Sequence, residues 1–221
     1  MLLISGKCLS QENRIILKFC PFALIDPATF PSIQAGLEFN LTKQIGIYGE
    51  FGYKMTYLDD SSIDTSFVSS KGLKIKTEIR YYLNKKRIYT EKTREFYIAT
   101  NLFFTKDSHN TSIHYTNKED TLTELHDQFG VRKNVSGANL LAGYQRSILL
   151  QNLICDLYVG FGVRFITVKT LDKEFDFEKD ELHGPIDVTV KSFSDRTDAK
   201  SGKSVRPNLT VGARICYVFK Y

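Results

Sequence analysis

The chain has 221 residues, which suits a single domain, because all-β barrels run to roughly 200 residues and more without splitting. It is 42% hydrophobic and 25% charged, and 13% of its residues are aromatic, so an intrinsically disordered chain is excluded. No stretch approaches the roughly 18 consecutive apolar residues of a membrane-spanning helix, which excludes a helical membrane protein.

The net charge of +5 is compatible with nucleic acid as a partner. The basic residues are nevertheless mixed with acids, and the densest basic run, Asn84–Arg87, is short. No basic stripe with interleaved aromatic residues is present, so we expect no nucleic-acid partner.

The first ten residues, MLLISGKCLS, resemble the end of a secretory signal peptide whose charged start is missing. The SQEN that follows is similar to a cleavage point before Gln11. We therefore expect residues 1–10 to be a truncated signal-peptide remnant and residues 11–221 to form the domain. The alternative is a short leader without a targeting role. Cys8 follows no convincing lipobox, so a lipoprotein is not predicted.

From Ile15 onward, apolar residues recur at every second position, which is the period of a β-strand. In the clearest run, Leu73 and Ile75 lie on one face, and Lys74 and Lys76 lie on the other. Each run has about ten residues, the length that a tilted strand needs to cross a bilayer. Eight runs are predicted, at 14–23, 32–42, 44–54, 71–83, 95–105, 134–146, 151–167 and 205–221.

The connections between these runs alternate in length. Short turns are predicted near residue 43, at 84–94 and at 147–150. Long polar loops are predicted near 56–70, 106–133 and 168–204. Short turns at one end and long loops at the other are typical of outer-membrane barrels, and an even strand number places both termini on the short-turn, periplasmic side. Within the last loop, His183-Gly184-Pro185 is a turn signal for an additional hairpin.

Glycines and charges indicate which face of the sheet points inward. Of the glycines in the runs, Gly49 alone falls on the apolar face. An eight-stranded barrel has little room inside, so the face with the small residues is expected to face inward. Charges enclosed there must pair, because an isolated buried charge is costly. The predicted interior ion-pair network consists of Lys18, Glu38, Glu50, Lys74, Lys76, Glu78, Arg80, Asp156, Arg164 and Arg214.

The chain ends in VGARICYVFKY, with Tyr217, Phe219 and Tyr221 at alternate positions. This end resembles the C-terminal signal that barrel-insertion machinery reads. Together with the eight runs, the sequence from Asn13 onward resembles the small outer-membrane barrels of the OmpA or OmpX type, in pattern and not in any signature motif. The resemblance implies an all-β fold, an eight-stranded antiparallel up-and-down transmembrane β-barrel in the outer membrane of a Gram-negative bacterium, surrounded by lipid and lipopolysaccharide.

No motif for catalysis, metal or cofactor stands out. The four histidines, His109, His114, His126 and His183, are expected in outward loops, where solvated His and Asp residues are common. Ser108 beside His109 is the one trace of a nucleophile and a base. No CxxC pair is present. By strand parity Cys155 lies on the apolar face and Cys20 and Cys216 on the polar face, so a disulfide from Cys155 to either is not expected.

The sequence therefore predicts a non-enzymatic outer-membrane barrel with a structural, adhesion or surface-recognition role. Its long loops would bind an extracellular partner of unknown identity, because function usually resides in loops on a rigid scaffold. Two alternatives stay open. One is a soluble lipocalin-like carrier with its apolar face around a ligand, and the other is an enzyme that modifies lipid A.

Overall fold

The computed structural model describes residues 15–21, 23, 32–42, 44–54, 71–83, 94–118, 123–148, 152–174, 176, 178–182 and 201–219. Strands dominate this part of the chain. They are β1 (Ile15–Phe19), β2 (Ser32–Asn40), β3 (Ile45–Lys54), β4 (Lys71–Tyr82), β5 (Arg94–Asn117), β6 (Glu124–Ser147), β7 (Leu153–Leu171), β8 (Asp180–Leu182) and β9 (Gly202–Phe219). In the described residues, no helix is long and apolar enough to cross a membrane.

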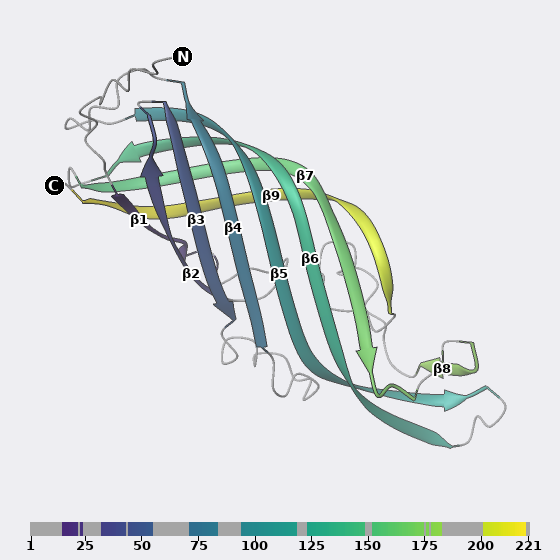
Figure 1. Ribbon diagram of the computed structural model, residues 1–221. Coiled ribbons are helices and arrows are strands. Elements are labelled where there is room, and N and C mark those ends of the chain that lie inside the picture. The colour runs from purple at the N-terminus through teal and green to yellow at the C-terminus, as the bar shows by residue number, and fades with distance from the viewer. Residues whose placement is uncertain are drawn as a thin grey trace, which may run out of the picture.

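Eight of these strands close into a ring of antiparallel neighbours (Figure 1). Their order is β4-β3-β2-β1-β9-β7-β6-β5, and pairing between β4 and β5 closes the ring. The small ninth strand, β8, extends the sheet beyond β5. The prediction of eight antiparallel strands, each paired with its neighbours along the chain, is confirmed, and the first strand pairs with the last.

One end of the ring collects the short connections, and we call it the short-turn end. Ile15, the first residue of β1, pairs there with Phe219, the last residue of β9. The first and the last strand of the ring therefore meet at the short-turn end. The β2–β3 turn is held by Thr42, whose hydroxyl oxygen accepts hydrogen bonds from the backbone N–H groups of Gln44 (3.2 Å) and Ile45 (2.9 Å). This is the local pattern by which Thr favours turns over strands.

The loop predicted at 106–133 is wrong in large part, and the one predicted at 168–204 is wrong at its two ends, because strands continue into both. β5 runs to Asn117 and β6 begins at Glu124, so the predicted loop at 106–133 is mostly a hairpin. β7 runs to Leu171, and β9 begins at Gly202. Asp172 follows β7 with a φ of 56°, a left-handed conformation that Asp tolerates better than most residues. The predicted loop at 56–70 and the turn signal at 183–185 lie outside the described residues.

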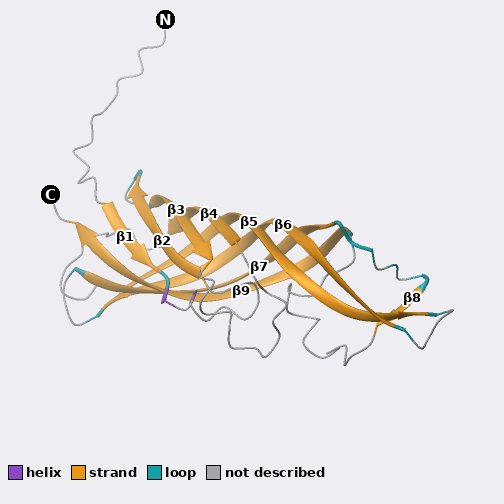
Figure 2. Cartoon of the chain, turned by 90° about the horizontal axis from the view of Figure 1, so that it is seen from below, coloured by secondary structure: helices purple, strands orange, loops and turns teal. Residues whose placement is uncertain are grey.

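The hairpin of residues 106–117 and 124–134, which we call the arm, extends past the rest of the ring (Figure 2). β8 pairs with its tip, through Tyr115, Thr116 and Asn117. The sequence failed to show the arm because 106–117 is polar on both faces, so the apolar alternation that identified the other strands is absent. The backbone pairing between β5 and β6 nevertheless continues through the arm.

The arm can be tested by a cross-strand disulfide. Asn110 and Gly130 are direct partners, and a Cβ at Gly130 would meet only ordinary contacts, the nearest at 3.5 Å. Directly opposite residues in an antiparallel pair lie within disulfide range. We expect the Asn110→Cys/Gly130→Cys variant to cross-link on mild oxidation, seen as a mobility shift on non-reducing gels. Asn110→Cys/Gln128→Cys, one row out of register, should not. Equal cross-linking of both variants would indicate a flexible loop.

Candidate functional site: the inward face and the apolar belt

The two faces of the ring differ in polarity around its middle. Lys18, Arg80 and Asp156 point inward and are fully buried, whereas Leu140 and Phe161 point outward and are 67% and 66% exposed. Alternate residues of one strand therefore have opposite chemistry. A lipocalin-like carrier requires the reverse, an apolar interior around its ligand, and this orientation is not what the structure has.

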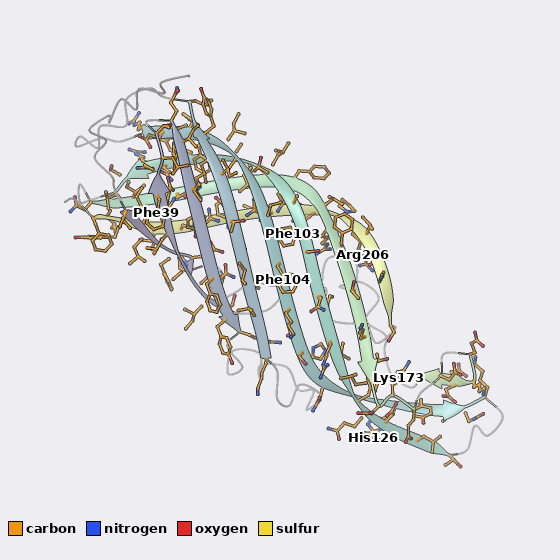
Figure 3. The ribbon with its side chains drawn as sticks, viewed as in Figure 1. Phe39, Phe103, Phe104, His126, Lys173 and Arg206 are labelled. Atoms are coloured by element: carbon orange, nitrogen blue, oxygen red, sulfur yellow. The ribbon has the colours of Figure 1, made fainter. Side chains whose placement is uncertain are left out.

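The exposed apolar side chains form a band around the ring, which we call the apolar belt. On β5 it spans residues 96–104, which is close to the about 9–11 residues that a transmembrane strand needs. Phe39 lies near the short-turn end and Phe104 farther along (Figure 3). Other members are Leu37, Ile47, Phe51, Tyr53, Ile79, Tyr81, Phe96, Ile98, Leu102, Leu140, Leu157, Val159, Phe161, Phe165, Val205, Leu209, Val211 and Tyr217.

The belt ends abruptly on four neighbouring strands. Lys106, Asn134, Thr167 and Lys203 are partners in one continuous row across β5, β6, β7 and β9. The row beside it within the belt contains Phe104 and, on the other strands, Ser136, Phe165 and Val205. All these side chains share the outward face, so the exterior changes from apolar to polar within two residues along β5, β7 and β9, whereas on β6 Ser136 is already polar.

Beyond this row, β6 and β7 place apolar side chains on the inward face. Phe129, Val131 and Val168 point inward there and form a buried cluster with Val135 and Ile166, which lie just before the row. Outward neighbours on the same strands are polar and exposed, as Arg132 is. The strands thus have apolar residues outside in one zone and inside in the next. Water on the outside of the second zone and an apolar medium outside the first would account for the inversion.

Eight charged side chains meet in the middle of the ring, and we call them the central cluster. Lys18 Nζ lies 2.8 Å from Glu38 Oε2 and 2.7 Å from Asp156 Oδ2, and Arg80 Nη1 lies 2.8 Å from Asp156 Oδ2. Arg80 also pairs with Glu38 and Glu78. The cluster comprises the acids Glu38, Glu50, Glu78 and Asp156 and the bases Lys18, Lys76, Arg80 and Arg214.

Arg214 and Lys76 complete the central cluster on its other side. Arg214 Nη2 lies 2.6 Å from Glu78 Oε1, its Nε lies 3.1 Å from Glu50 Oε2, and Lys76 Nζ lies 2.8 Å from Glu50 Oε1. Four acids and four bases give the cluster no net charge. Such balance is what allows so many charges to be buried together, because each would otherwise carry a large desolvation cost.

Tyrosines hold the two arginines of the central cluster in place. The Tyr48 ring lies between them, 4.8 Å from the Arg80 guanidinium carbon and 4.6 Å from that of Arg214. Tyr97 stacks on Arg80 at 4.5 Å and Tyr158 on Arg214 at 4.0 Å. Such cation–π contacts are strongest in desolvated sites. Their hydroxyls also take part, with Tyr48 donating to Glu50 (2.6 Å) and Tyr97 to Asp156 (2.8 Å).

Sequence reasoning missed these tyrosines, although a signal was available. Tyr97 pairs directly with Gly143, and Tyr158 pairs with Gly212. A Cβ at either glycine would collide with the tyrosine ring. An aromatic residue on the polar face, opposite a glycine, therefore marks a ring lying flat over the partner strand.

The structure separates the ten predicted network residues into two groups. Eight form the central cluster. The other two, Lys74 and Arg164, also point inward but line a cavity of about 590 Å³ on the side of the cluster that is away from the short-turn end. Lys76, Glu78 and Arg214 border the same cavity from the cluster side. Apart from Lys76, the residues of the central cluster are at most a few per cent exposed. The cluster therefore fills the interior of the ring between the cavity and the short-turn end.

The histidines lie on strands and not in the outward loops predicted for them, except His183, which lies outside the described residues. His109 is buried and faces Asp107, with its Nδ1 3.3 Å from Oδ2. Burial opposes ionisation of Asp107, but His109 and Lys54, 3.0 Å away, outweigh it and lower the pKa of its carboxyl. The rings of His114 and His126 meet edge to face, with their centroids 4.8 Å apart, and His126 lies near the arm's tip (Figure 3).

Ser108 and His109 cannot act together as nucleophile and base. They are consecutive residues of β5, so their side chains point to opposite faces of the sheet. The described residues contain no group of three or more His, Cys, Asp or Glu side chains arranged to hold a metal ion. Cys20, Cys155 and Cys216 are free thiols.

Comparisons with known proteins give no family assignment. No family model and no curated protein matches the sequence. Among solved structures, the chain is similar to a protein described as a major outer membrane protein from Thermus thermophilus. The two chains are 13% identical, the match covers 94% of this chain and 98% of the other, and the TM-score is 0.42.

Removing one member of the central cluster should be strongly destabilising. Arg80→Leu leaves Glu38, Glu78 and Asp156 short of a cation in a buried site, which typically costs about 3–5 kcal/mol. We expect a matching loss in the free energy of unfolding, measured by urea titration of the protein folded in vesicles. Arg132→Leu, on the exposed outward face, is the control and should change it little. A small effect of Arg80→Leu would mean that water reaches the cluster.

Filling the space under a tyrosine should also destabilise the ring. We expect Gly143→Leu to displace Tyr97 and lower the unfolding midpoint in urea, because overpacking a filled interior forces strained side chains. Adding Tyr97→Ala should recover part of the loss. The matched control is Gly49→Leu, where a Cβ meets nothing within 4 Å. If Gly143→Leu and Gly49→Leu behave alike, the interior is looser than described.

Proposed function

We propose that the chain is a transmembrane β-barrel of a bacterial outer membrane, with no enzymatic activity of its own. The observations that support this most directly are the end of the exposed apolar belt along β5, β7 and β9 and the inward apolar cluster that follows it on β6 and β7. A protein surrounded by water throughout would gain nothing from exposing Leu140 and Phe161 while burying Arg80. In a bilayer the same arrangement buries the belt in hydrocarbon and leaves no unpaired strand edge around most of the ring.

The surface just beyond the belt fits the head groups of anionic lipid. Lys106 and Lys203 lie in the first polar row, and Lys71, Arg132 and Lys169 lie in the next. All five point outward and are exposed, and the two rows contain no acidic residue. We propose that these bases bind the phosphate groups of lipopolysaccharide, since Lys and Arg are the usual ligands of phosphate.

The arm is the part of the molecule that supports a role in adhesion or surface recognition. It is an ordered hairpin that projects beyond the basic rows, with β8 against its tip. Its outward side chains are polar, and His126 is presented near its end (Figure 3) with His114 against it. We propose that the arm, with the segments 56–70 and 168–204, binds an extracellular partner, and that β9 is recognised by the barrel-insertion machinery.

A charged residue in the belt tests the proposal against a soluble protein. Leu140→Arg puts a charge near the middle of the belt, which costs about 2–4 kcal/mol in transmembrane barrels. Gln128→Arg places the same residue on the same strand and face, but in the arm. We expect Leu140→Arg to reduce insertion into outer membranes and Gln128→Arg to leave it unchanged. Insertion is measured by the gel-mobility difference between boiled and unboiled membrane samples.

External protease gives an independent readout of the same preparation. The inserted protein should be cut only in segments beyond the basic rows. If Leu140→Arg inserts normally, or if the native chain stays in the soluble fraction without a heat-dependent mobility change, the proposal is wrong.

A further inference from the structure

Two histidines face each other across the arm. His114 on β5 and His126 on β6 are direct partners in the antiparallel pair, so their side chains lie on the same face of the hairpin. Their rings meet edge to face with the centroids 4.8 Å apart, and His126 lies near the tip of the arm (Figure 3). Both side chains are exposed, that of His114 by 57%. Two paired strands thus present two imidazoles to the solvent at one point.

A carboxylate orients one of these imidazoles. Glu124 lies two residues before His126 on β6, so it shares the face of the two histidines. Its Oε1 lies 3.4 Å from Nδ1 of His114. A carboxylate beside one ring nitrogen fixes the proton there and leaves the other nitrogen with a lone pair, which is how carboxylates position the histidine ligands of metal ions. Glu124 therefore leaves Nε2 of His114 available for a metal ion.

The neighbouring row adds a second carboxylate. Thr116 is the partner of Glu124 on β6 and of Glu181 on β8, so these three side chains lie in one row next to the histidine pair. Both glutamates are exposed. Lys118, the next basic residue along the chain, donates from its Nζ to the backbone oxygen of Glu178 at 2.7 Å. Two carboxylates beside two imidazoles favour a cation at this place.

The spacing of the pair suits one shared metal ion. A zinc–imidazole bond is about 2.0–2.1 Å long, so two nitrogens on one ion lie at most about 4 Å apart. Directly opposite residues have Cβ atoms roughly 4.5–5.5 Å apart, and rotation of the rings brings two nitrogens into that range. Both side chains are exposed, so they can leave their edge-to-face contact. Two protein ligands are fewer than a closed site has, and water takes the remaining positions.

We propose that His114 and His126 bind one divalent transition-metal ion of the copper and zinc kind, with Glu124 as the positioning residue of His114. Imidazole nitrogen is a preferred ligand of these ions, whereas Ca²⁺ and Mg²⁺ take oxygen ligands. The site requires only the strand pairing of the arm and no bilayer around the belt, so it stands or falls independently of the proposed function.

A zinc titration of the whole protein tests the site. The chain is folded in an uncharged detergent, circular dichroism verifies the strand content of each variant, and Zn²⁺ binding is measured by calorimetry. We expect binding that is lost in His114→Gln and in His126→Gln. In NMR spectra of histidine-labelled protein, the ring signals of both residues should shift together with added Zn²⁺, while those of His109, which is buried inside the ring, should stay in place.

A variant with the same number of histidines tests the register. His126→Gln/Gln128→His moves the second imidazole one row along the same face, where it lies diagonal to His114 at roughly 7–8 Å. We expect the binding midpoint to move to higher Zn²⁺ concentration, because one ion no longer reaches both rings. If this variant binds Zn²⁺ as tightly as the native chain, or if the single variants keep the ion, the pair is not a site and the binding is adventitious.

The positioning role of Glu124 is tested separately. Removal of such an outer carboxylate typically weakens metal affinity by about 10–100-fold. We expect a loss of this size in Glu124→Gln with unchanged stoichiometry, and Glu124→Asp, which keeps the carboxylate, should recover part of the affinity. Glu181→Gln removes the same charge from the same row and is the matched control, with a smaller effect expected. Equal losses in the two Gln variants would overturn the positioning role and leave only general attraction of a cation.

Discussion

Charge balance inside the narrow ring is the constraint on which the rest of the structure depends. Four acids and four bases from β1, β2, β3, β4, β7 and β9 meet there, and each lies within ion-pairing distance of at least one opposite charge. Because the pairs join strands that are far apart around the ring, they connect its opposite walls. At the level of the central cluster, an interior filled in this way leaves little room for large apolar side chains, which point outward there.

Aromatic rings and glycines make this packing geometrically feasible. An eight-stranded ring has too little room for a large side chain on every inward position. Tyr97 and Tyr158 lie over glycines of the neighbouring strand, which lets their rings reach the guanidinium groups at the centre. Small and large inward residues therefore alternate between strands, and the arginines are fixed by both charge and stacking.

The sequence predicted the strands of the belt well, because a lipid-facing exterior imposes a strict two-residue period on them. The inward direction of the polar face also followed from the glycines. The arm was taken for a loop, since a strand with water outside and polar residues such as Lys106 and Asn110 has no such period. Partners within the central cluster could not be assigned, because they depend on strand register, and a slip of one residue exchanges the faces. Lys74 and Arg164 were grouped with the cluster because parity gives the face of a residue and not its height along the ring.

The brevity of β1 has a consequence for the order of assembly. The hairpins of the other strands join segments close in sequence, whereas β1 must find β9 across about 200 residues of chain, and closure of so long a loop is slow in forming. The ring is then completed by the five residues of β1. Lys18 is one of them, and its ammonium reaches across to Asp156 of β7, 2.7 Å away. Closure between β1 and β9 thus brings together two opposite charges of the central cluster, and their attraction favours it.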